Sequence, residues 1–546
     1  MSDVGNLGGV PYIILGSYLA LLLVLGIVGY RRRQEESEED YYLAGRGQGW
    51  VITSLTIMAT FFSSFALLGA PGMVYREGVV FALVSLNVPV AGYCIYLLGS
   101  RIWEAGRAHG YVTPADMICD YYGSHVVLRL LVVLVGILFT IPYVMMQLKA
   151  GGELAAVMFD SYAGAFGLGA VVLAGITTVY IMIGGMRSVA WTDALQCVLL
   201  LSGMLLSGVA LVSFFGGLSA FAQAVSQLPE SSLTVPGNTG FWSISTLFSV
   251  SLLMPIGGII QPAQWMRFYA ARDLETLRRS ALIFIILLTA CFLLGIMLVG
   301  LGGQVLFPLE LDGSEGVRPH PEVGSYDQIL VAVIQRTLPE LLGPALGLVF
   351  VSMMMVAIMA AAMSTADSSL HALSALMTRD VYDRFVRPEA GEREKVWVGR
   401  LVILGATAVA LALVLAGREE GSSLAGIMEM IVGLGLFAAA FSIQLLPITL
   451  DVLYLHRGSS VGAVAGLVTG LVVAFCFTSL FASLASAVAG SLIEPILLAL
   501  LDLVNSCKAW MPLHATAWGS SKKLHRGSPP AYRKRCRYKC QKQRWG

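Results

Sequence analysis

Three oxygen-bearing residues stand at helical spacing inside an apolar run of the chain. Within residues 356–370, VAIMAAAMSTADSSL, the residues Ala361, Ser364 and Thr365 are three and four positions apart, so they share one helix face. Polar groups at membrane depth are costly and usually face a cavity or a partner helix. Two hydroxyls and a carbonyl are oxygen-only ligands that suit a small hard cation. The spacing therefore predicts either a site for a monovalent cation or a Ser/Thr pair that packs two helices together.

The composition predicts a polytopic helical membrane protein. The 546 residues are 57% hydrophobic and 13% charged, with a mean hydropathy of +0.77. A spanning helix needs ~20 mostly apolar residues. The first apolar run lacks a basic leading segment and is long enough to remain as an anchor. The runs predict about thirteen spans, at 10–30, 50–74, 78–100, 126–150, 163–185, 189–216, 244–263, 278–305, 343–376, 398–417, 424–455, 459–482 and 486–504.

Two of these runs are interrupted by glycine and proline. Span 2 contains Gly69 and Pro71, and span 7 contains Pro255 and Pro262. Proline removes a backbone donor and glycine permits unwinding. Spans five apart have opposite directions, and paired broken helices in two inverted halves predict a transport site. The alternative is that these are the ordinary kinks of membrane helices.

The placement of lysine and arginine predicts the orientation. With the N-terminus outside, the arginines fall mostly in inside loops, which favours N-out and C-in in a plasma (inner) membrane. The inside loops then carry Arg31, Arg32, Arg33, Arg46, Arg101, Arg107, Arg187, Arg267, Arg272, Arg278, Arg279, Arg379, Arg384, Arg387, Arg393, Lys395 and Arg457.

Four motifs, in order along the chain, resemble those of the sodium–solute symporter family. They are DYYLAGRGQGW at 40–50, GGMRSVAWTDALQ at 184–196, AAAMSTADSSL at 360–370, and Arg457 followed by spaced glycines. The resemblance covers about residues 10–480. It implies an all-α LeuT-type fold with two inverted five-helix repeats. The expected parts are an N-terminal helix and cytoplasmic loop at 1–49, repeats at 50–216 and 244–455, accessory helices at 459–504, and a basic cytoplasmic tail, expected to be disordered, at 505–546.

The same resemblance implies binding residues. The sodium ligands would be Ala59, Phe62, Ala361, Ser364 and Thr365. The solute site would include Ser63, Met254, Gly258 and Gln261. Asp193 and Asp367 would line the ion pathway, with a solvated loop acid as the alternative for Asp193.

The resemblance also implies a sodium-coupled symporter that imports a small organic solute by alternating access. Phe61, Met254 and Gly258 depart from the family's proline carriers, and the polar lining of its sugar carriers is missing, which disfavours proline and sugars. A mostly apolar pocket beside the positive end of a half-helix instead suits a monocarboxylate, an amino acid or a similar organic acid. Sodium is the expected cofactor; the solute and the bilayer are the expected partners, and the sequence indicates no oligomeric state. A proton-coupled transporter using Asp193 or Asp367, or a channel or sensor on the same scaffold, remains the alternative. Neither an enzyme nor a nucleic-acid binder is expected, because the chain has no nucleotide loop, metal-ligand cluster or HExxH pair.

Overall fold

The structure is a computed structural model that describes residues 9–31, 38–84, 87–159, 162, 164–311, 317–418 and 428–484. The predicted span 486–504 and the basic tail 505–546 lie outside these residues. In the first half of the chain, the helices are α1 (Val10–Arg31), α2 (Glu38–Leu43), α3 (Trp50–Phe61), α4 (Ala70–Glu77), α5 (Val79–Val84), α6 (Asn87–Cys94), α7 (Ser100–His109), α8 (Pro114–Tyr121), α9 (Val126–Met158), α10 (Ala165–Phe214), α11 (Leu218–Val225), α12 (Glu230–Leu233), α13 (Ile244–Ile260) and α14 (Pro262–Ala270).

The second half is also helical, apart from one short hairpin. The two strands of that hairpin, β1 (Glu310–Leu311) and β2 (Val317–Arg318), pair antiparallel and were not predicted. The helices are α15 (Leu274–Cys291), α16 (Met297–Leu306), α17 (Ile329–Leu342), α18 (Pro344–Ala375), α19 (Glu392–Gly417), α21 (Ile431–Ser442), α22 (Leu446–Leu450) and α23 (Ser460–Leu484). Short π-helical segments extend several of them, among them Phe65–Gly69 before α4 and Leu376–Val386 after α18.

The predicted spans correspond closely to apolar helices. Among the described residues, nine helices are long and apolar enough to cross a membrane, and two bent helix pairs raise the number to eleven. The apolar α23 coincides with the predicted span at 459–482. The helical membrane architecture is thus confirmed, whereas the count of thirteen is not, because the last predicted span is not described.

Both predicted interruptions are sharp bends. Trp50–Phe61 and Phe65–Glu77 meet at 58°, and Ile244–Ile260 and Pro262–Ala270 meet at 56°. At the first bend Phe62 leaves helical geometry with φ −89° and ψ 78°. At the second, Gln261 is extended and precedes Pro262, which has no N–H to continue the ladder. The first break therefore falls at Phe62–Ser64, upstream of Gly69 and Pro71.

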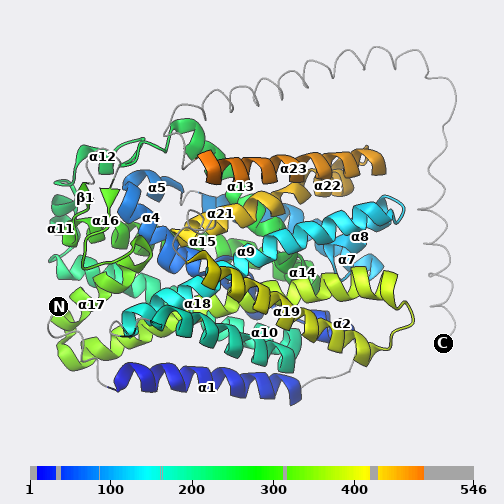
Figure 1. Cartoon of the computed structure of the whole chain (residues 1–546), viewed down its shortest axis with the longest axis horizontal. Helices are drawn as coiled ribbons and strands as arrows, with labels where there is room; N and C mark the ends of the chain where they lie inside the picture. Colours follow the sequence, from blue (N-terminus) through cyan, green and yellow to red (C-terminus); the bar gives the residue numbers. More distant parts are fainter. Residues whose placement is uncertain are drawn as a thin grey trace, which may run out of the picture. The chain divides into compact units, whose positions relative to one another are not determined.

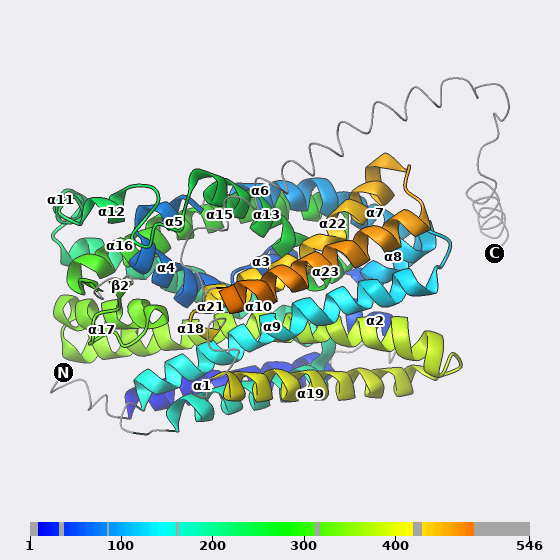
Figure 2. The ribbon, with the colours of Figure 1, turned by 45° about the horizontal axis from the view of Figure 1, so that its top comes forward.

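Helices α9, α10 and α18 pack against one another (Figures 1 and 2), and α10 and α18 also pack against α3. The long α10 consists of two predicted spans joined at Gly185, where φ is +60° and ψ is −165°. A Cβ atom at Gly185 would lie 2.7 Å from the ring of Tyr41. Glycine is therefore required there by both its backbone angles and its close contact.

A second glycine of α10 supports a direct packing prediction. A Cβ atom at Gly208 would lie 1.7 Å from the carbonyl oxygen of Leu294, whereas a Cβ atom at Gly175 would have no atom of another described residue within 4 Å beyond the neighbouring turns of its own helix. We expect Gly208→Ala to lower the free energy of unfolding by about 1–3 kcal/mol through overpacking. Gly175→Ala, in the same helix, should leave it unchanged or raise it. Thermal unfolding of the two purified variants measures this, and equal Tm values would contradict the close helix contact.

A buried ion pair joins the segment before α17 to two membrane helices. The Lys149 ammonium of α9 donates to Asp327 and lies 3.5 Å from Glu153. The backbone N–H of Ile431, at the start of α21, donates to the same Asp327 oxygen at 2.9 Å. Burial raises the pKa of the Asp327 carboxyl, and Lys149 opposes that shift. The segment around Tyr326–Gln328 is thereby held against α9 and α21.

Candidate functional site

Four of the five predicted sodium ligands converge where the first broken helix meets α18. The hydroxyls of Ser364 and Thr365 each lie 3.2 Å from the carbonyl oxygen of Ala59. The Ser364 hydroxyl also lies 3.1 Å from the carbonyl oxygen of Ala361. Phe62, the fifth predicted ligand, is the residue at which the helix breaks. All five residues are buried.

The break explains why backbone oxygens are free to act here. In a continuous helix the Ala59 carbonyl would accept a hydrogen bond from the N–H of Ser63, four residues later. Helix α3 ends at Phe61, before that residue. The Ala59 carbonyl instead accepts hydrogen bonds from the hydroxyls of Ser364 and Thr365 on α18. Such a set of neutral oxygens suits a small hard cation, whose charge the carbonyl dipoles stabilise without a carboxylate ligand. The residues present therefore fit a monovalent ion.

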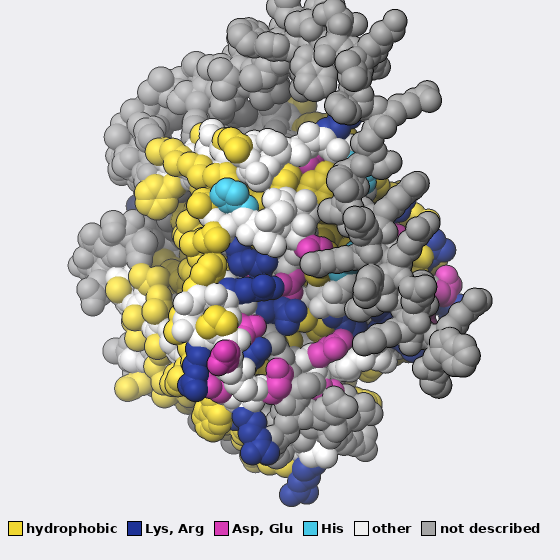
Figure 3. Space-filling model, turned by 90° about the vertical axis from the view of Figure 1, so that its right-hand side faces the viewer, with side chains coloured by type: hydrophobic (Ala, Val, Ile, Leu, Met, Phe, Trp, Pro, Cys, Tyr) yellow, Lys and Arg dark blue, Asp and Glu magenta, His cyan; other side chains and the backbone are white. Residues whose placement is uncertain are grey.

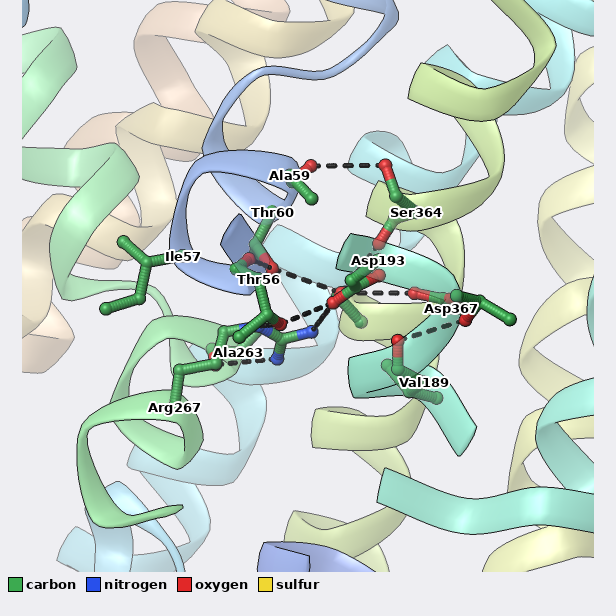
Figure 4. Close-up of polar contacts among 12 residues, drawn as sticks. Thr56, Ile57, Ala59, Thr60, Val189, Asp193, Ala263, Arg267, Ser364 and Asp367 are labelled. Carbon is green, nitrogen blue, oxygen red and sulfur yellow. Dashed lines mark hydrogen bonds and ion pairs between the residues drawn. The ribbon is translucent and has the colours of Figure 1, made fainter. Parts of the chain in front are cut away.

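A buried ion pair lies beside this cluster. The Arg267 guanidinium of α14 lies 3.0 Å from Asp193 of α10, and both side chains are almost completely inaccessible to solvent. Thr56 donates to the same Asp193 oxygen at 2.5 Å and accepts from Arg267 at 3.1 Å. Asp193 is therefore a buried, paired carboxylate rather than a solvated loop acid. Arg267, expected in an inside loop, is buried among the helices (Figure 4).

Asp367, which lies on α18, joins this network of hydrogen bonds. It accepts from the Tyr180 hydroxyl at 2.6 Å and from the Ser368 hydroxyl at 3.1 Å. Ser368 also receives a hydrogen bond from Arg267, and its one hydroxyl proton is shared between Asp367 and the Ser364 carbonyl, which lies 2.6 Å away. Figure 4 shows Arg267, Asp193 and Asp367 directed toward one another from different helices. The predicted pathway acids thus adjoin the predicted sodium ligands through a chain of hydrogen bonds, in which Asp193 pairs directly with Arg267 and Asp367 is linked to Arg267 through Ser368.

A cavity on the other side of the break contains two of the four predicted solute residues. Met254 and Gly258 line it, and a Cβ atom at Gly258 would lie 2.8 Å from the Phe61 ring. The cavity has a volume of about 40 Å³. Its lining residues are Phe61, Phe62, Phe65, Ala66, Asn87, Phe139, Tyr143, Met254, Gly258, Phe292, Gly435 and Ala439.

The other two predicted solute residues are buried at the breaks but are not among those lining the cavity. The Ser63 hydroxyl accepts from the Phe65 N–H at 3.1 Å. Gln261, at the second break, has a buried side-chain amide whose nitrogen and oxygen find no hydrogen-bond partner among the described residues. Buried polar groups are normally satisfied, so an unpaired buried amide points to a partner outside the chain.

Several residues of this region were missed by sequence reasoning. Asn87 is an amide within an apolar run, a signal that could have drawn attention to it, and Arg267 was counted only as a loop charge. Gln147 accepts from both the N–H and the hydroxyl of Ser64, at 3.2 and 2.7 Å, and so caps the second half of the broken helix. Phe139 and Phe292 resemble ordinary core residues in sequence, and only the fold brings them to the cavity.

Comparisons with known proteins agree with this geometry. The model of the sodium:solute symporter family matches residues 41–470. The sodium/proline symporter of Haemophilus influenzae is 28% identical over 453 residues, which cover 82% of this chain and 84% of that protein. The high-affinity proline transporter PutP of Bacillus subtilis is 26% identical over 462 residues, covering 81% and 87%. A solved structure of a substrate-bound, outward-open Na⁺-coupled sialic acid symporter matches with a TM-score of 0.64 and 20% identity, covering 88% of this chain and 98% of that one. The predicted LeuT-type fold is confirmed.

Proposed function

This chain belongs to the sodium:solute symporter family, and from that premise we propose that it imports a small organic solute with sodium by alternating access. Sodium-coupled solute symport is the activity of the family, and sodium is the coupling ion. Alternating access uses paired discontinuous helices whose breaks hold the ion and the solute. The two bends of 58° and 56° in this chain supply such a pair.

The observation that carries the proposal is the convergence of neutral oxygens at the first break. We assign the sodium site to the carbonyls of Ala59, Phe62 and Ala361 and to the hydroxyls of Ser364 and Thr365. Because the ligands come from two different helices, sodium would hold α3 and α18 together. Release of the ion would then free the two helices to move relative to each other.

The ion pathway and the chain's orientation complete the proposal. Asp193 and Asp367 would attract sodium along a route between the ion site and the end of α14, where Arg267 limits their net charge. Exposed arginines lie near that end of the helices, including Arg101 and Arg272. Figure 3 shows charged side chains gathered on this face beside hydrophobic ones. By the positive-inside rule we propose that this end is cytoplasmic and that the N-terminus lies outside. The proposed inverted repeats span residues 50–216 and 244–455.

The solute is proposed to be a small amphipathic compound, within the class of monocarboxylates, amino acids and similar organic acids. An apolar cavity with few polar groups favours a compact solute with a substantial apolar part. The relatives are named for proline, and an amino acid of that size belongs to the proposed class. The Phe61 ring packs against Gly258, where any larger residue would collide with it, and this contact shapes the pocket of this chain.

Thermal unfolding of the purified protein tests the proposal. A ligand present at 100 times its Kd raises the free energy of unfolding by about 2.7 kcal/mol. We expect sodium to raise the Tm where potassium does not, and one member of a panel of amino acids, short monocarboxylates and sugars to raise it further only with sodium. Stabilisation by acidification alone, with no response to sodium, would instead favour proton coupling. A channel or sensor would lack the mutual dependence of sodium and solute.

A further inference from the structure

Two exposed arginines lie over aromatic rings beside the short π-helical segment Ile95–Gly99, which joins α6 to α7. The Arg278 guanidinium of α15 lies 6.0 Å from the centre of the Tyr96 ring. Helix α15 is held close to this part of the chain, since a Cβ atom at Gly92, on α6, would lie 2.1 Å from the side chain of Ile285. A cation and the face of a ring attract each other, so this contact holds Arg278 against Tyr96.

The second arginine is linked to the same segment through another tyrosine. The guanidinium of Arg101, on α7, lies 5.9 Å from the centre of the Tyr454 ring. The Tyr454 hydroxyl donates to the carbonyl of Leu97, the residue after Tyr96, at 2.8 Å. Two positive groups from different helices are therefore held at neighbouring positions of one short segment.

The positive charge of these two arginines is only partly balanced. No carboxylate among the described residues forms an ion pair with Arg278, whereas its neighbour Arg279 pairs with Glu275 at 2.9 Å. Arg101 lies 3.6 Å from Glu104, but both of these side chains are about half exposed, and such pairs contribute little. An anion that approached the two arginines would therefore meet a net positive charge.

An exposed apolar surface continues from Arg278 along α15. Leu282 and Ile286 stand four and eight positions after Arg278, so the three residues share one helix face. Both apolar side chains are more than half exposed, as are those of Tyr93 and Leu97 on the adjoining α6 and π-helical segment. Arginine and tyrosine beside exposed apolar residues are typical of the boundary at which lipid headgroups meet acyl chains. An amphiphile with an anionic head and apolar tails matches both parts of this surface.

We propose that Arg101 and Arg278 bind the phosphate of an anionic phospholipid, whose acyl chains lie along the exposed apolar face of α15. Guanidinium groups bind phosphate through paired N–H donors, and the two tyrosines hold them in place for it. A zwitterionic phospholipid carries the same phosphate together with an ammonium group that cancels its charge, so it binds more weakly. This lipid site goes beyond the proposed transport and involves neither the ion ligands nor the solute cavity.

Thermal unfolding of the purified full-length protein in detergent, without sodium or solute, tests the lipid site. Dioleoyl phosphatidylglycerol and dioleoyl phosphatidylcholine are titrated separately, because they share their acyl chains and differ in headgroup charge. We expect phosphatidylglycerol to raise the Tm with a half-saturating concentration about tenfold lower than that of phosphatidylcholine. Glycerol phosphate, which supplies the anion without acyl chains, should leave the Tm unchanged.

Two neighbouring arginines supply the matched variants. Arg278→Gln and Arg279→Gln each remove one exposed positive charge from the same turn of α15, but Arg278 lies over Tyr96 and Arg279 pairs with Glu275. Arg278→Gln should raise the half-saturating concentration of phosphatidylglycerol about fivefold, and its combination with Arg101→Gln at least about tenfold. Arg279→Gln should stay within about twofold of the parent protein. Because all three arginines are exposed, the Tm without lipid should hardly change.

Equal half-saturating concentrations for the two lipids, or no response to either, would overturn the proposal. So would an equal effect of Arg278→Gln and Arg279→Gln, since it would show attraction to the net charge of this face and not binding at the two arginines. Stabilisation by glycerol phosphate to the same extent as by phosphatidylglycerol would show a site for a free anion, which contradicts the role given to the apolar face of α15.

Discussion

Replacing Arg267 with methionine is expected to destabilise the protein by about 3–5 kcal/mol, because it leaves a buried carboxylate without its cation. Arg267 lies 3.0 Å from Asp193, and both side chains are inaccessible to solvent. Methionine keeps much of the apolar stem, so the loss reflects the charge more than the volume. The change should appear as a lower Tm and a lower yield of monodisperse protein.

The matched control and the second variant keep this prediction testable if Arg267→Met folds poorly. Arg272→Met removes an arginine from an ion pair of similar length, 2.9 Å, whose members are 63% and 42% exposed. Exposed pairs contribute ~0–1 kcal/mol, so its Tm should hardly change. The double variant Arg267→Met/Asp193→Asn should recover part of the lost stability, since it removes the unpaired charge. A double variant less stable than Arg267→Met would contradict the account of the pair.

Removing one hydroxyl from the proposed sodium site is expected to weaken sodium binding by about 10- to 100-fold. Contacts between a dipole and a charged group contribute ~1.5–3 kcal/mol, and 1.4 kcal/mol is a factor of ten. Ser364→Ala and Thr365→Ala should each raise the sodium concentration at half-maximal stabilisation by that factor. Thr365→Ser retains the oxygen and should stay close to the parent protein.

Ser352→Ala is the control for these two variants. Ser352 is a buried serine on the same helix, α18, and its hydroxyl bonds back to the Leu348 carbonyl at 2.7 Å. Ser352→Ala removes a serine hydroxyl from the same helix, but at least two turns away from the ion site, so sodium binding should not change. Equal weakening by Ser352→Ala and Ser364→Ala would mean that the hydroxyls act on helix stability and not on the ion.

The sequence was most informative where a residue type is improbable in its surroundings. Ser364 and Thr365 are conspicuous in an apolar run, and proline at positions 255 and 262 marks a helix that is interrupted. The structure brings Ala59 to those hydroxyls, as the family resemblance implied, and bends both helices. Helix type and approximate ends could also be predicted, because a membrane permits few alternatives to an apolar helix.

What the sequence could not supply were contacts between distant segments. Arg267 belongs to a cluster of arginines that all resemble loop charges, and only the packing of α14 against α3 and α18 buries it. Asn87 and Phe139 are separated by about fifty residues and meet only in the folded cavity. Lys149 lies at the end of a span, where a lysine often reaches toward water, yet it pairs with Asp327. Local periodicity contains no information about such partners.

Entry of ²²Na⁺ into proteoliposomes, with and without a mixture of amino acids and small organic acids outside, tests the central claim most directly. Coupled symport predicts that the mixture accelerates sodium entry in a saturable way, and that Ser364→Ala abolishes the acceleration at low sodium while Ser352→Ala does not. Sodium entry that ignores the mixture, together with proton entry that responds to it, would contradict sodium coupling at the site formed by Ala59, Ser364 and Thr365.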